Sequence, residues 1–136
     1  MFGKTGLDMI NEDYVSYETA QLLKSKGFDE LCYACYEYFS SGVTMYSGWP
    51  FEYKGEPVHN TNDRVKCPTL QMAMKWLRET HNCVINVNYI DFLEHGEVWS
   101  YTIINKSTFA EYYKDTENSY KLACEEAIKY CLEKII

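Results

Sequence analysis

The chain has 136 residues, and its 46% hydrophobic and 24% charged residues are ordinary for one globular domain. Thirteen Lys and Arg against twenty Asp and Glu give a formal net charge of −7, which argues against broad nucleic-acid binding and against attachment to anionic membranes. No apolar run is long enough to cross a membrane and no signal-peptide pattern is visible, so we expect a cytoplasmic protein. We expect a single domain over residues 1–136, with residues 1–13 flexible or loosely attached.

The first predicted helix covers residues 17–26. Ser16 precedes it as an N-cap, because its hydroxyl can accept a hydrogen bond from an unpaired amide of the first turn. Gly27 follows at the position where a left-handed backbone ends many helices. Phe28 can then contact Leu23.

Two strands and a long loop follow this helix. Residues 32–39 are rich in aromatic side chains and contain neither Gly nor Pro, which favours a strand. Residues 43–46 are a candidate return strand. Residues 47–66 show no helical period and carry two Gly and two Pro, so we expect an ordered loop of the length that is often functional. Three aromatic residues lie in it at strand spacing: Trp49, Phe51 and Tyr53.

The second half contains a further helix, two more strands and a last helix. A helix is predicted from residue 68 or 69 to residue 80, with Asn82 as the left-handed residue that ends it. Residues 83–90 and 98–105 alternate between apolar and polar side chains and should form an antiparallel pair. A last amphipathic helix covers residues 117–134. The order α-β-β-loop-α-β-β-α predicts a small α+β two-layer sandwich, an antiparallel sheet with helices on one face.

The six cysteines raise the question of a metal or redox site. Cys32 and Cys35 have zinc-like spacing, and Cys67, His81 and Cys83 could supply further ligands. However, the first pair lies in a predicted strand and not at a helix N-terminus, where a redox-active thiol is activated. We therefore expect reduced, buried structural thiols, no metal and no cofactor.

Catalytic patterns are weak. A Cys or Ser nucleophile needs a base, and the base needs a third group to orient it. No motif connects His59, His81 or His95 to a nucleophile. The chain is therefore not expected to be an enzyme.

Aromatic residues make up 16% of the chain, which is the most unusual feature of its composition. Tyr and Trp suit interfaces and pockets for flat ligands, and a guanidinium can hold a phosphate or carboxylate. The alternatives are that the loop rings cover a second small core and that Arg78 makes a surface ion pair. The candidate ligand-binding residues are Trp49, Phe51, Tyr53, Arg64, Trp76, Arg78 and His81.

Three blocks of the chain resemble a known protein family. They are residues 68–82, which contain Trp-Leu-Arg-Glu-Thr-His-Asn, the helix region 16–28 and the Glu-Ala-rich segment 123–132. Together they resemble small uncharacterised proteins of gut bacterial genomes and of the phages and prophages in them. The resemblance implies an accessory protein of a phage or mobile element, and it supplies no activity or binding residue.

These observations lead to three functional hypotheses. The first is a non-enzymatic counter-defence protein that sequesters a small nucleotide-like host immune signal. The second is an acidic, Tyr-rich interaction module that inhibits or adapts a host protein. The third is a hydrolase of a nucleotide signal. A homodimer is expected, since twofold dimers are the commonest oligomers.

Overall fold

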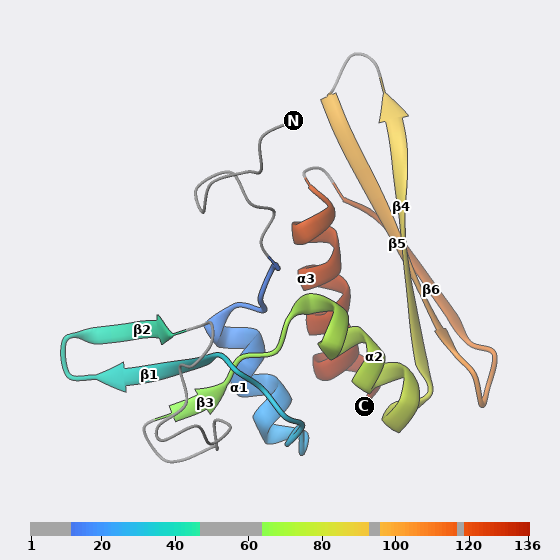
Figure 1. The fold of residues 1–136 in the computed structure, drawn as a ribbon. Coiled ribbons are helices and arrows are strands. Elements are labelled where there is room, and N and C mark those ends of the chain that lie inside the picture. Colours follow the sequence, from blue (N-terminus) through green and yellow to red (C-terminus); the bar gives the residue numbers. More distant parts are fainter. Residues whose placement is uncertain (1–11, 47–63, 93–95, 117–118) are drawn as a thin grey trace, which may run out of the picture.

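Three helices lie between two antiparallel sheets in the computed structural model, which describes residues 12–46, 64–92, 96–116 and 119–136 (Figure 1). The α+β class predicted from the sequence is confirmed. The elements in chain order are α1 (Tyr17–Ser25), β1 (Cys35–Phe39), β2 (Gly42–Tyr46), β3 (Arg64–Lys66), α2 (Leu70–His81), β4 (Cys83–Phe92), β5 (Gly96–Asn105), β6 (Glu111–Thr116) and α3 (Tyr120–Tyr130).

The strands are divided between two sheets of three, with orders β2-β1-β3 and β4-β5-β6. Sequence reasoning expected four strands in one sheet, so β3 and β6 are additions to that prediction. β3 occupies the last three residues of the segment predicted as a loop, and its Lys66 pairs with Cys35 of β1. β1 begins only at Cys35, three residues later than expected.

The ends of α1 follow the predicted chemistry. The Ser16 hydroxyl accepts a hydrogen bond from the Thr19 amide at 3.2 Å. Gly27 has φ of +92°, and the Phe28 amide donates to the Leu23 carbonyl at 3.0 Å. The cap at Ser16 and the ending at Gly27 are therefore confirmed.

The other two helices are also capped by side chains. The Thr69 hydroxyl accepts from the Met72 amide at 3.1 Å, and Asn82 ends α2 with φ of +59°, as predicted. α3 begins after Ser119, whose hydroxyl accepts from the Leu122 amide at 3.2 Å. It continues into a π-helical turn over Cys131–Ile135. Because Ser119 caps the helix with an extended backbone, the predicted start at residue 117 is too early.

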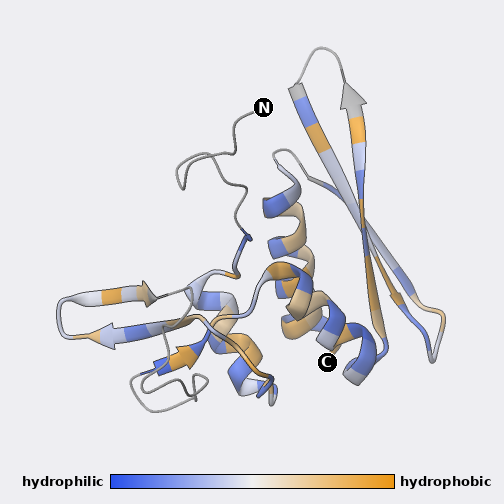
Figure 2. Cartoon of the chain, in the orientation of Figure 1, coloured by the Kyte–Doolittle hydropathy of each residue, from blue (hydrophilic) through white to orange (hydrophobic). Residues whose placement is uncertain are grey.

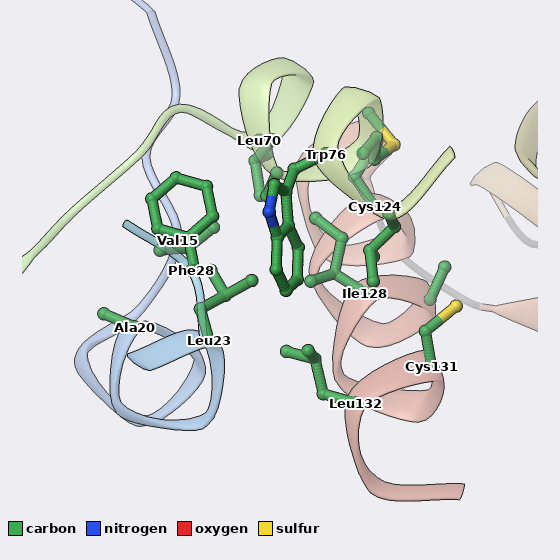
Figure 3. Packing of buried hydrophobic residues seen from close by; sticks show 14 of the residues in the cluster. Val15, Ala20, Leu23, Phe28, Leu70, Trp76, Cys124, Ile128, Cys131 and Leu132 are labelled. Atoms are coloured by element: carbon green, nitrogen blue, oxygen red, sulfur yellow. The ribbon is translucent and has the colours of Figure 1, made fainter. Parts of the chain in front are cut away.

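The main core lies where the three helices meet. Leu23 of α1, Trp76 and Leu77 of α2, and Ile128 of α3 are all at most 7% exposed (Figure 3). Hydrophobic residues of the helices concentrate at this junction, and hydrophilic ones lie on the outer sides (Figure 2). Burial of these side chains is the main force that holds α1 and α2 against α3.

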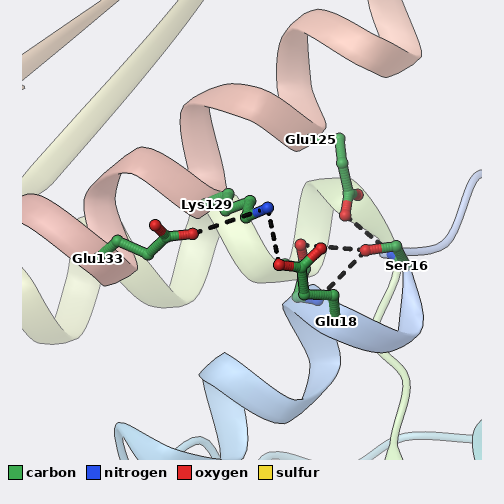
Figure 4. Close-up of polar contacts among 6 residues, drawn as sticks. Ser16, Glu18, Glu125, Lys129 and Glu133 are labelled. Carbon is green, nitrogen blue, oxygen red and sulfur yellow. Dashed lines mark hydrogen bonds and ion pairs between the residues drawn. The ribbon is translucent and has the colours of Figure 1, made fainter.

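Polar contacts fix α1 against α3 at the edge of this core (Figure 4). The Ser16 amide donates to Glu125 Oε1 at 3.0 Å, so a carboxylate of α3 satisfies an unpaired group at the start of α1. Lys129 Nζ lies 2.8 Å from a carboxylate oxygen of Glu18 and 3.8 Å from one of Glu133. These exposed pairs define the geometry more than they add stability.

Among the helices that the structure describes, none is long and apolar enough to cross a membrane.

Candidate functional site

A groove of about 500 Å³ lies between one face of α2 and the segment that joins α1 to β1. Its size falls within the range typical of ligand sites. Its lining consists of Glu30, Leu31, Tyr33, Gln71, Met72, Lys75, Trp76, Glu79 and Thr80.

The α2 wall presents residues that recur every three or four positions, which places them on one side of the helix. Met72 and Trp76 supply its apolar part. The indole of Trp76 is 7% exposed and is held from two sides. It makes edge-to-face contacts with two rings, and the distance between ring centres is 5.3 Å to Phe28 and 4.7 Å to His81. Trp76 is therefore a rigid wall of the groove.

The opposite wall is an extended segment in which burial alternates. Cys32 and Ala34 point inward and are 2% and 1% exposed, whereas Leu31 and Tyr33 point outward and are 50% and 44% exposed. Cys32 Sγ lies 3.9 Å from Met72 Sδ, so this segment packs directly against α2. The alternation leaves two large apolar side chains at the rim.

A buried lysine holds this wall in place. The Lys66 side chain is 6% exposed, and its Nζ donates to the Glu30 carbonyl at 2.8 Å. The same Nζ lies 2.9 Å from Asp29 Oδ1. Because Lys66 belongs to β3, it connects the wall to the first sheet.

The rim of the groove is acidic. Glu30 and Glu79 carry negative charge, and Lys75 is the lysine among the lining residues. The net charge of the lining is therefore −1, in a chain whose formal charge is −7. An apolar interior with an acidic rim favours a hydrophobic ligand with positive charge.

The candidate residues from the sequence are dispersed by the fold. Trp76 and His81 are in contact, and Trp76 lines the groove. Arg64 lies on β3 and forms an ion pair with Glu37 of β1 at 3.5 Å. Arg78 is exposed on α2 and is not part of the groove lining. Trp49, Phe51 and Tyr53 lie outside the described residues, as do His59 and His95.

His81 is half-buried at the C-terminal end of α2. Its Nε2 is buried, and no described residue makes a hydrogen bond to it. The ring thus contributes packing against Trp76.

The six cysteines are free and buried. Burial raises the pKa of Cys32 to about 11 and that of Cys67 to about 12, so both thiols stay protonated near neutral pH. A protonated thiol is a poor nucleophile and a poor metal ligand. Within the described ranges no group of three or more His, Cys, Asp or Glu residues is arranged to hold a metal ion.

Sequence reasoning missed most of the groove. Tyr33 falls within the strand predicted over residues 32–39, and neither Leu31 nor Met72 is among the candidate residues. A usable signal was the position of Leu31 and Tyr33 on the opposite side of the segment from Cys32 and Ala34. One wall of the groove is also held by Lys66, which donates to the Glu30 carbonyl from more than thirty residues further along the chain.

No protein-family model matches the chain, and no curated protein or solved structure shows significant similarity to it.

Proposed function

We propose that this protein is a non-enzymatic interaction module whose groove binds a basic, hydrophobic segment of a partner protein. The observation that carries the proposal is the combination of an apolar groove with an acidic rim. The rim of Leu31 and Tyr33 offers apolar surface to a partner, and Glu30 and Glu79 favour Lys or Arg beside it. The resemblance to phage and prophage proteins favours a host protein as the partner.

Sequestration of a small nucleotide-like ligand is the second candidate. Its support is the volume of the groove together with the indole of Trp76 in its wall, since aromatic rings stack with bases. The charge of the groove weighs against it, because phosphates are repelled by Glu30 and Glu79. Arg64 and Arg78, which sequence reasoning assigned to such a ligand, do not line the groove.

A peptide selection tests the first candidate. A random peptide display library is selected on the full chain, and the enriched peptides are measured by fluorescence polarisation. We expect peptides that combine Lys or Arg with Leu or aromatic residues. Leu31→Glu should weaken their binding at least roughly tenfold, as expected for an anchor position of an interface. Glu79→Lys should weaken the same peptides by loss of charge attraction.

Leu122→Glu is the matched control, because Leu122 is 49% exposed, much like Leu31 at 50%, and lies on α3 outside the groove. It should leave peptide binding unchanged. Enriched peptides that are acidic would contradict the proposal. So would peptides whose binding is weakened equally by Leu31→Glu and by Leu122→Glu. Calorimetry against cyclic dinucleotides and ADP-ribose derivatives provides the second arm. Binding of such a ligand that Leu31→Glu abolishes would replace the first candidate with the second.

A further inference from the structure

β4 is a ten-residue strand at one edge of its sheet. Among the described residues it pairs with β5 alone, so the backbone groups along its outer side have no strand partner. Figure 1 shows β4 and β5 extending past the N-terminal end of α3. Natural proteins usually protect long edge strands with charged side chains, especially Lys, or with Pro.

The two edges of this sheet differ in this protection. β6, at the opposite edge, carries Glu111, Lys114 and Asp115 within six residues. β4 carries a single charged residue, Asp91, near its end. The first eight residues of β4 therefore present an uncharged edge, which permits pairing with another strand.

Burial also decreases toward the β4 edge on the face that α3 covers. Tyr101 and Ile103 of β5 are 0% and 2% exposed. Their cross-strand neighbours on β4, Val87 and Ile85, are only half-buried. Tyr89, the next residue on this face, is 55% exposed. The apolar face thus continues beyond the cover that the described helices provide, and an added strand would bury its edge.

The sequence of β4 is symmetric in character about Val87. Residues 84–90 read Val-Ile-Asn-Val-Asn-Tyr-Ile. Positions equally distant from Val87 are therefore either both large and apolar or aromatic, or both Asn. A twofold interface places each residue opposite the one equally distant from the centre, so here apolar residues would meet apolar residues and Asn would meet Asn. Antiparallel pairing centred on Val87 would place Ile85 opposite Tyr89 of the partner subunit and Asn86 opposite Asn88 of the partner subunit. Aromatic residues opposite β-branched ones are favourable cross-strand pairs.

We propose that β4 pairs with β4 of a second copy of this chain, antiparallel and centred on Val87. The two sheets then form one continuous six-stranded sheet. Neither Val87 nor any other β4 residue lines the groove, so this interface is independent of the proposed function.

Charge substitutions on the exposed side chains of Asn86 and Asn88 test the proposal. Size-exclusion chromatography with light scattering should show a dimer for the unmodified full chain. The double variants N86K/N88K and N86E/N88E each oppose like charges at the centre, so each should weaken self-association roughly tenfold or more. An equimolar mixture of the two variants should form a dimer again, because Lys then opposes Glu. Restored dimers also show that both variants are folded.

Tyr113→Lys is the control at the other edge, since Tyr113 is 55% exposed on β6. It should leave the dimer intact. A monomeric unmodified chain would overturn the proposal. So would a dimer that survives N86K/N88K, a mixture that stays monomeric, or equal loss in Tyr113→Lys.

Discussion

Replacing Lys66 with methionine tests how the extended wall of the groove is held. The Lys66 ammonium is buried and donates to the Glu30 carbonyl at 2.8 Å, and it lies 2.9 Å from Asp29 Oδ1. A hydrogen bond from a charged donor contributes about 1.5–3 kcal/mol, whereas an ion pair with a largely exposed partner contributes about 0–1 kcal/mol. The Asp29 side chain is 78% exposed, so the carbonyl bond should dominate.

Methionine keeps the buried stem of the side chain and removes only the charge and the donors. The variant no longer has to bury a charged ammonium, and the desolvation cost that it avoids offsets part of the free energy lost with the hydrogen bond. We therefore expect Lys66→Met to lower the free energy of unfolding by about 1–2 kcal/mol. Asp29→Asn should cost under about 0.5 kcal/mol. Urea unfolding gives both values.

Amide hydrogen exchange over residues 29–33 reports the wall directly, and it should become faster in Lys66→Met than in Asp29→Asn. A Lys66→Met variant as stable as the unmodified protein, with unchanged exchange over residues 29–33, would refute this account. It would mean that desolvation of the ammonium costs as much as its contacts contribute.

Two further predictions concern buried groups. The Tyr101 hydroxyl is buried without a well-formed hydrogen bond to a described residue, and the Tyr112 side chain offers it only a weak interaction. Tyr101→Phe should therefore leave stability unchanged or raise it by up to about 1 kcal/mol in urea unfolding. A loss of more than about 1 kcal/mol would show that the hydroxyl has a partner. Burial raises the pKa of Cys32 to about 11 and that of Cys67 to about 12 from an ordinary value of 9.0, so the folded state holds these protons more tightly than the unfolded state. Their contribution to stability is therefore complete below pH 9 and is lost as the pH rises toward 11 to 12. Urea midpoints measured along this range should fall, and Cys67→Ala should make the fall shallower; a midpoint that stays constant above pH 9 would contradict the assignment.

Local signals predicted the helices well because helix ends depend on neighbouring residues. The residues at the ends of these helices act within one turn, so their roles can be predicted from the local sequence; they are Ser16, Gly27 and Asn82. Strand pairing depends on distant residues, and here prediction was weaker. β3 has three residues, too few for a period of two to be recognised, and it forms only because it lies beside β1.

The groove was not predictable for the same reason. Its two walls come from residues 30–33 and from α2, and the lysine that holds them comes from β3. Each piece has an ordinary local explanation: an extended connection, an amphipathic helix and a charged strand end. Only the pairing of β1 with β3 brings Lys66 to the Glu30 carbonyl. A site assembled from three separate segments leaves no motif with fixed spacing.

The aromatic surplus shows why composition alone is weak support for a ligand. Tyr112 stacks on Tyr130 with ring centres 3.9 Å apart, and this pair packs β6 against α3. Trp99 of β5 makes an edge contact with Tyr120 of α3 at 5.3 Å. Short helices and three-stranded sheets enclose little volume, and large rings bridge them with few residues. These rings contact one another, so they supply packing. Trp76 also lines the larger groove beside α2, and the acidic rim of that groove favours a basic segment over a phosphate.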